Sequence, residues 1–380
     1  MGDDPGSSIA FAEKVLSLLD TGSFTTSYKY ALLLSIVDAT LESTEPDGSA
    51  PDVLRGRDLG RRVFARYWHQ ARPFGAAGPL RQSTQRDVVV KIAELRAELA
   101  LPEHTSLDAA RSLHPTAIER LEREVVVTVV RYPIPLLQRF GSAGTVEDRF
   151  IYDLGWRDGI GAGQVNRADF DDRLHLRPGA GERLLEVAGL VRPVVEREWL
   201  RHVARRNDDQ VDDLRLESFL FGATRTALVH LRDPLLGLQL GRCFYCRGDR
   251  GPWEVNHFLP WARWPDDRLD NLVVAHRACN NDKRAALAGL DHLERWWTRL
   301  SGTSVAGRRL ADIGARASWP RRPERTASGA RALYLHQPDG AMLWAGRGEV
   351  ERLDARRLQA VLDPALGIAA EAPRDRYGAS

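Results

Sequence analysis

The chain has 380 residues, which is enough for two or three domains with separate apolar cores. A hydrophobic content of 43% and a charged content of 28% are typical of a globular protein, and the longest apolar runs are too short to cross a bilayer. The formal net charge of +2 excludes a uniformly basic nucleic-acid binder, so any basic surface has to be local.

Cysteine usage and the N-terminal residues indicate a compartment. The three cysteines all lie between residues 243 and 279, so the composition does not support a disulfide framework. The first residues are acidic and lack the basic-then-apolar pattern of a signal peptide. We therefore expect a cytoplasmic protein with no membrane association, whose cysteines stay reduced and able to bind metal.

Residues 1–150 are predicted to form a helical N-terminal domain. Apolar residues recur at helical spacing over residues 9–21, 28–41, 59–71 and 88–99. Residues 118–130 also favour a helix, although the run VVVTVV is compatible with a strand. No motif here indicates a function. The arginines between residues 55 and 66 are compatible with a solvated helix face and with a surface that contacts phosphates.

Residues 151–235 are predicted to form an α/β connecting region. The glycine cluster at residues 154–165 lacks the strand, helix and lysine of a phosphate loop, so it indicates a turn. The pattern that follows predicts a short strand pair and a long helix over residues 170–207. A polar linker is expected at residues 207–213 and one further helix over residues 216–239.

Residues 301–380 are predicted to be an arginine-rich C-terminal extension with a hairpin. Segment 315–330 indicates an irregular connector, and Pro338, Asp339 and Gly340 are predicted to form the turn of the hairpin. Eight arginines stand against three acidic residues from Arg308 to Arg347. This bias is compatible with a phosphate-tracking surface and equally with a solvated loop.

Two pairs of metal-ligand residues stand out in residues 236–300. Cys243 and Cys246 form a C-x-x-C pair, and His276 and Cys279 form an H-x-x-C pair. Zinc prefers four tetrahedral thiolate or imidazole ligands, and a closed set of four is structural. We expect a structural Zn²⁺ that contributes folding energy to a small module. Three buried free cysteines are the alternative, and His276 is the least secure ligand because its imidazole can also stay unliganded.

The segments WEVNHFLPW, LDNLVVAH and CNNDK, together with these pairs, resemble the successive motifs of the HNH endonuclease family. The resemblance covers residues 243 to about 287. It implies a two-stranded hairpin packed on one helix around a metal ion. The expected fold class is therefore mainly α with a small α+β module: a helical N-terminal region, a zinc-stapled ββα-metal nuclease domain at 236–300 and a short C-terminal hairpin region.

The resemblance also implies roles for individual residues. His257 corresponds to the general base, and Asn271 to the asparagine that orients the hairpin loop. Asn280 corresponds to a catalytic residue on the metal side, and together with Asn256 it would hold a catalytic Mg²⁺ or Mn²⁺. The imidazole of His257 is suited to take a proton from water near neutral pH. The metal would stabilise the leaving oxygen of the cleaved phosphodiester.

Asn256 departs from the family pattern, which has aspartate directly before the histidine. A neutral amide binds a hard divalent ion less strongly than a carboxylate. Weaker metal affinity, a supporting role for Glu254, a metal shell completed by substrate and loss of activity are all open consequences. Strand alternation places Glu254 and Asn256 on one face and His257 on the other.

We therefore expect a metal-dependent HNH endonuclease that hydrolyses phosphodiester bonds, with DNA favoured over RNA as the nucleic-acid partner. Lys283 and Arg284 are expected to contact phosphate. The resemblance and the long helical N-terminal region indicate a role in bacterial restriction or anti-phage defence. The alternative is a zinc-dependent nucleic-acid-binding module without cleavage activity. Association as a homo-oligomer or with partner proteins of a defence system is left open.

Overall fold

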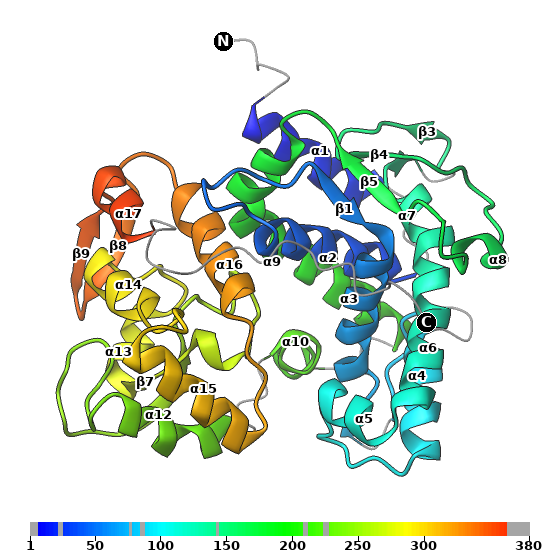
Figure 1. Cartoon of the computed structure of the whole chain (residues 1–380). Helices are drawn as coiled ribbons and strands as arrows, with labels where there is room; N and C mark the ends of the chain where they lie inside the picture. Colours follow the sequence, from blue (N-terminus) through cyan, green and yellow to red (C-terminus); the bar gives the residue numbers. More distant parts are fainter. Residues whose placement is uncertain are drawn as a thin grey trace. The chain divides into compact units, whose positions relative to one another are not determined.

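The computed structural model describes residues 7–21, 26–75, 78–83, 88–141, 144–207, 212–222 and 228–362. The chain is 55% helical and its sheets have two or three strands, which confirms the predicted mainly α fold with a small α+β module (Figure 1). No helix in these ranges has both the length and the apolar character needed to span a membrane.

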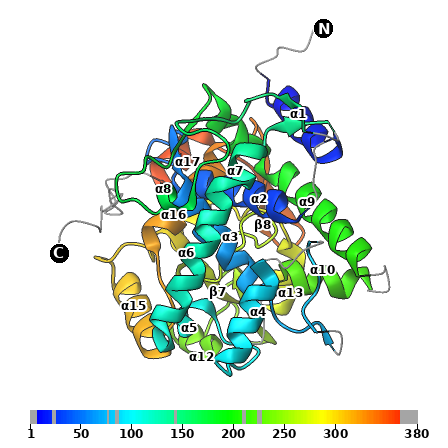
Figure 2. The same ribbon diagram turned by 90° about the vertical axis from the view of Figure 1, so that its right-hand side faces the viewer.

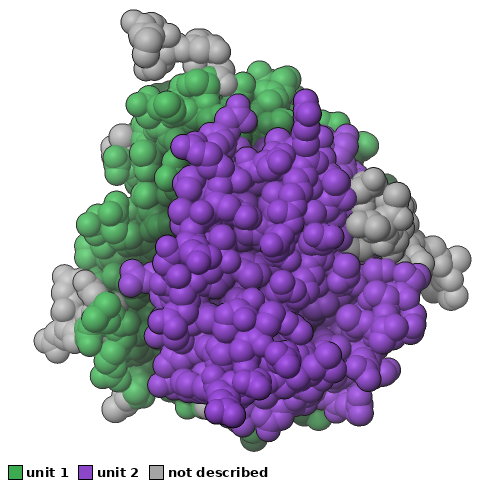
Figure 3. Space-filling model, turned by 90° about the vertical axis from the view of Figure 1, so that its left-hand side faces the viewer, with its two compact units in different colours: residues 1–40, 51–222 green, residues 41–50, 223–380 purple. Residues whose placement is uncertain are grey.

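The chain forms two compact units, coloured separately in Figure 3. The first comprises residues 1–40 and 51–222, and the second comprises residues 41–50 and 223–380. This division is coarser than the four segments predicted from the sequence. It also assigns a short segment from the N-terminal part of the chain to the unit that contains all three cysteines.

Helices build the first unit. They are α1 (Ser8–Thr21), α2 (Tyr28–Glu42, whose last two residues count with the second unit), α3 (Gly56–Gln70), α4 (Val88–Glu98), α5 (Leu107–Leu113), α6 (Pro115–Arg131), α7 (Pro133–Leu136), α8 (Ala162–Val165), α9 (Ala180–Arg206) and α10 (Asp213–Phe221). The run VVVTVV is helical, as part of α6. α3 and α6 lie side by side in Figures 1 and 2. Gly60 permits this close approach, because a Cβ there would lie 2.8 Å from the Cα of Val126.

The first unit also contains short strands. β1 (Val53–Arg55), β5 (Arg173–Leu176) and β4 (Tyr152–Leu154) form an antiparallel sheet in that order, and β2 (Arg139–Phe140) pairs with β3 (Val146–Glu147). The strand pair expected over residues 170–207 is therefore wrong: a single strand, β5, lies there and its partners come from elsewhere. The predicted linker at residues 207–213 falls largely outside the described residues.

The second unit contains a two-stranded hairpin together with helices and a second short hairpin. Its elements are η2 (Val229–Leu231), α12 (Arg232–Leu238), β6 (Trp253–His257), η3 (Leu269–Asn271), β7 (Leu272–His276), α13 (Arg277–Lys283), α14 (Leu290–Trp297), α15 (Val305–Ala317), α16 (Pro323–Leu335), β8 (Met342–Gly346), β9 (Glu349–Arg352) and α17 (Ala355–Val361). β6 and β7 are antiparallel, and α13 packs against both. Leucines of α12 and apolar residues of β7 and α15 share one buried cluster.

Three sequence-based expectations for this part are wrong. A single helix over residues 216–239 does not form: α10 ends at Phe221, Gly222 after it is extended, and η2 and α12 form a separate helical segment from Val229 to Leu238. Segment 315–330 is mostly helical, because Ser304 caps α15 and Pro323 occupies the first turn of α16. The turn of the C-terminal hairpin lies between β8 and β9 at Gly348, with φ +72°, while residues 338–340 connect α16 to β8.

Candidate functional site

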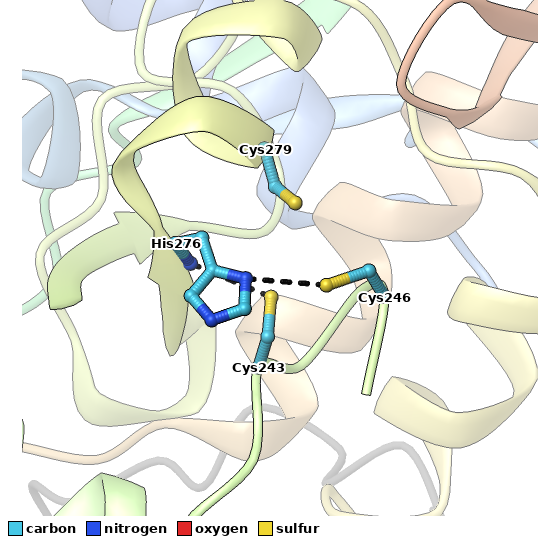
Figure 4. A group of neighbouring side chains, drawn as sticks. All are labelled: Cys243, Cys246, His276 and Cys279. Atoms are coloured by element: carbon cyan, nitrogen blue, oxygen red, sulfur yellow. Dashed lines mark hydrogen bonds between the residues drawn. The ribbon is translucent and has the colours of Figure 1, made fainter. Parts of the chain in front are cut away.

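Four potential metal ligands converge in the second unit. The ligand atoms of Cys243, Cys246, His276 and Cys279 all lie within 4.8 Å of one another (Figure 4). The Sγ atom of Cys246 lies 3.2 Å from Nδ1 of His276, so this ring nitrogen faces the cluster. Three thiols and one imidazole match the donor chemistry and the number of ligands that structural zinc prefers, so the cluster is compatible with a zinc ion.

Local structure brings the two ligand pairs together. Cys243 and Cys246 lie on a tight turn that closes with a bond from the backbone N–H of Cys243 to the carbonyl of Gly248 (2.9 Å). His276 ends β7 and Cys279 lies in the first turn of α13, so the strand-to-helix junction supplies the second pair. The cluster therefore joins the turn at residues 243–248 to the hairpin and the helix.

The His276 ring is held on two sides. Trp253, its partner across the β6–β7 ladder, stacks on it with ring centroids 4.5 Å apart. On the other side the backbone approaches so closely that a Cβ at Gly251 would lie 2.8 Å from the ring, and this glycine has φ +146°. Such packing fixes the ring with Nδ1 turned toward the sulfurs, an orientation that a zinc ligand at His276 requires.

The thiols lie close enough together to perturb one another's pKa values. Burial and the neighbouring Cys243 raise the pKa of Cys279 to about 12. Gathering thiolates in one place is unfavourable unless a cation is present, and a coordinating thiol is deprotonated by the metal. Ionised thiols in this cluster would repel one another without a cation. With a bound metal ion, the same thiolates can act as its ligands.

Asn271 fastens the loop between β6 and β7. The residue is fully buried, and its side-chain oxygen accepts from the backbone N–H of Leu259 (2.8 Å). Its amide group donates to the carbonyls of Leu259 and Asp266, both at 3.1 Å. The side chain therefore ties the start of the loop to its end.

A polar network connects β6 to α13. Asn256 donates from Nδ2 to the Oδ1 atom of Asn280, and its own Oδ1 accepts from the hydroxyl of Tyr245 (2.7 Å). Asn280 in turn donates to Glu254 (2.9 Å), whose other oxygen accepts from Arg277 (2.6 Å). As strand alternation requires, Glu254 and Asn256 share the face of β6 that lies toward α13.

This network contains the residues that the sequence predicts as ligands of a catalytic divalent ion. Hard divalent cations take oxygen ligands. Asn256, Asn280 and Glu254 offer oxygens of the right type, but they include a single carboxylate, and it is already paired with Arg277. Within the described ranges, the zinc cluster is the one place where three or more His, Cys, Asp or Glu ligand atoms gather. The oxygens of Asn256, Asn280 and Glu254 are of the type that a hard cation prefers, but together they provide little negative charge.

His257 ends β6 with its ring against an acidic residue that the sequence did not single out. Its Nε2 lies 2.6 Å from Oδ1 of Asp267. The exposed fraction of the side chain is 12% for His257 and 32% for Asp267. Trp261 lies beside the ring, with centroids 5.1 Å apart. The only sequence signal for Asp267 was a carboxylate in the loop that follows the histidine.

The two basic residues expected to contact phosphate lie in different surroundings. Arg284 directly follows α13 and is exposed. Lys283 is 1% exposed, and its ammonium donates to the backbone carbonyl of His257 at 3.4 Å. Burial and the nearby Arg263 lower the pKa of Lys283 to about 7. In this conformation Lys283 supports the backbone of His257 and does not reach the surface.

The arginine-rich segment 308–347 is in part a structural element. Arg321 pairs with the buried Asp270 (2.7 Å) and Arg325 pairs with Glu42. Arg331 is 2% exposed and stacks over Trp297. These arginines are tied to the interior of the second unit, so the segment is not a uniformly solvated loop.

Residues 249–288 match the family model described as HNH endonuclease. The matched segment contains β6, β7 and α13, with His257, Asn271 and Asn280, and it includes His276 and Cys279 of the metal cluster. The match confirms the resemblance inferred from the motifs. No curated protein and no solved structure matches the chain.

Proposed function

We propose that the second unit is a metal-dependent endonuclease of the HNH type, which hydrolyses phosphodiester bonds. The observation that carries this proposal is the position of the family match. It spans the β6–β7–α13 module, with His257 at the end of β6, Asn271 in η3 just before β7, and Asn280 in α13. The metal cluster adjoins the same module, so a structural zinc would stabilise the fold that presents these residues.

The arrangement suggests how the residues divide the work. Nε2 of His257 is occupied by Asp267, and Nδ1 has no protein partner among the described residues. Nδ1 is therefore the nitrogen that takes a proton from the attacking water. Asn271 holds the loop that carries the next residues of the site. Asn256, Asn280 and Glu254 would hold Mg²⁺ or Mn²⁺, which when bound stabilises the negative charge that develops on the leaving oxygen.

We further propose that the substrate is DNA and that the protein acts in bacterial restriction or anti-phage defence in the cytoplasm. Exposed Arg284, directly after α13, is available to a phosphate backbone. The family resemblance favours DNA over RNA, and a helical unit of more than two hundred residues in the same chain as a small nuclease is suited to recognition or regulation. Oligomers or partner proteins of a defence system fit the same role.

The test is cleavage of supercoiled plasmid DNA in Mg²⁺ or Mn²⁺ by wild type and by His257→Ala. The matched control is His175→Ala, which removes an exposed histidine of the first unit. We expect nicking by wild type and the control, and a loss of about 10²-fold or more for His257→Ala. Equal rates for wild type and His257→Ala would contradict the assignment of the base.

A second function, nucleic-acid binding without cleavage, is favoured by Asn256. Its amide is engaged by Tyr245 and Asn280, and it brings no negative charge to the metal side. Binding of DNA without cleavage in any divalent metal, unchanged by Asn256→Asp, would support this function. Cleavage that strengthens in Asn256→Asp would instead support a nuclease with a weakened metal site.

A further inference from the structure

The loop between β6 and β7 places a carboxylate directly on the candidate base. Nε2 of His257 and Oδ1 of Asp267 are 2.6 Å apart, which is shorter than an ordinary N–H···O hydrogen bond and indicates a close contact between the ring and the carboxylate. An ionised carboxylate only accepts hydrogen bonds, so Nε2 must carry the proton. The lone pair of the neutral ring then resides on Nδ1, and the contact selects one tautomer.

The carboxylate of Asp267 is not engaged by the charged residues next to it, so it is available to His257. The neighbouring Arg268 pairs with the buried Asp266 instead. Trp319 donates to the backbone carbonyl of Asp267 (2.7 Å), which fixes the residue without engaging its carboxylate. Among the described residues, His257 is the one protein group bonded to that carboxylate.

The loop that carries Asp267 is fastened at several points. Asn271 bonds to the carbonyl of Asp266, the residue just before it. Trp264 is fully buried and donates from Nε1 to Glu42 (3.1 Å). A side chain on a loop held in this way keeps its direction, and a fixed partner can orient an imidazole to within a small angle.

We propose that Asp267 is the positioning residue of the base, a role that rests on the proposed function of the site. Asp267 holds the Nε2–H tautomer and aims Nδ1 at the water. Nδ1 accepts the proton as the O–H bond breaks, and the water oxygen attacks phosphorus while the bond to the leaving oxygen breaks. The leaving oxygen takes a proton from solvent, and the proton on Nδ1 returns to solvent. Asp267 stays ionised and stabilises the positive ring that forms transiently.

The kinetic test compares wild type, Asp267→Ala and Asp267→Asn in plasmid cleavage. We expect Asp267→Ala to lower kcat about 10- to 100-fold with little change in KM, the range seen when the partner of a functional histidine is removed. Asp267→Asn keeps an acceptor oxygen and should fall between the two. Asp312→Ala, which removes an exposed carboxylate on α15, is the matched control and should cleave like wild type.

A double variant distinguishes positioning from general stabilisation. In the His257→Ala background, Asp267→Ala should cause no further loss, because the two residues act as one unit. Zinc content and unfolding temperature are measured for every variant. Wild-type kcat in Asp267→Ala, or an equal loss in both backgrounds, would overturn the proposal.

A spectroscopic arm does not depend on cleavage. In protein labelled with ¹⁵N at histidine, the ring nitrogens of His257, assigned by their absence in His257→Ala, report the tautomer. We expect the Nε2–H form in wild type and a mixture in Asp267→Ala. If wild type cleaves no substrate, the proposed function fails, and this arm alone decides whether Asp267 fixes the ring. An unchanged tautomer in Asp267→Ala overturns the inference.

Discussion

Replacing Lys283 with methionine is expected to stabilise the second unit most strongly below pH 7. Lys283 is 1% exposed, and burial with the nearby Arg263 lowers its pKa from 10.5 to about 7. A lysine in the unfolded chain keeps its proton up to about pH 10.5. Between these two pKa values the unfolded chain binds one proton more than the folded chain, so wild-type stability rises with pH across this window. Protonation of the buried Lys283 therefore costs no stability above pH 10.5. The cost grows as the pH falls and is complete once the pH has fallen through 7.

The size of the effect follows from the pKa of Lys283. Each pH unit within the window changes the free energy of unfolding by about 1.4 kcal/mol, so the full shift corresponds to about 5 kcal/mol. From pH 6 to pH 9 the chain crosses about two units of the window. The stability advantage of Lys283→Met over wild type should therefore shrink by about 3 kcal/mol between these two pH values.

The assay is urea-induced unfolding of the zinc-loaded protein at pH 6 and pH 9, followed by tryptophan fluorescence. Any pH dependence of zinc binding is common to both proteins and cancels in their difference. Arg284→Met, which changes an exposed neighbour, is the control and should show no such trend. A difference between Lys283→Met and wild type that is constant or grows from pH 6 to pH 9 would refute the reasoning.

Two further predictions concern the metal cluster and the loop. Cys243→Ser combined with Cys246→Ser should remove about one zinc per chain, as measured by metal analysis. It should also unfold the β6–β7–α13 module, because zinc ligation supplies on the order of 10 kcal/mol to such modules. Retained zinc with unchanged amide exchange in β7 would contradict this prediction. Asn271→Ala should lower the free energy of unfolding by about 2–4 kcal/mol, because it removes three buried hydrogen bonds and leaves the N–H of Leu259 unpaired. A loss below about 1 kcal/mol in urea unfolding would show that the loop does not depend on this side chain.

The parts of the site that sequence could predict are those encoded by short spacing. The candidate metal ligands can be identified from the C-x-x-C and H-x-x-C pairs, because the residues of each pair lie on one turn or at one strand-to-helix junction. Side chains alternate between the two faces of a strand, so the sequence also predicts that Glu254 and Asn256 lie on one face of β6 and His257 on the other. The hairpin and helix follow from motifs that together occupy about forty residues.

Other features depend on contacts that spacing does not encode. Asp267 meets His257 across an irregular loop, whose path is fixed by Asn271 and Trp264 rather than by a regular period. Lysine is normally exposed, so nothing in the sequence indicated the burial of Lys283. The helix α16 was missed because the prolines, arginines and glycine of segment 315–330 were given more weight than the alanines and leucines of the helix, which favour a helix and are largely buried in it.

The assignment of residues 41–50 to the second unit has a consequence for how this unit could be inherited. Glu42 accepts hydrogen bonds from Trp264 and Arg325, so the C-terminal half alone would lack the carboxylate that these two side chains share. A recombination event that moved only the codons for residues 223–380 into another gene would transfer a module without this carboxylate, and the buried indole N–H of Trp264 would lose its acceptor. The two units are therefore expected to be inherited as one continuous gene.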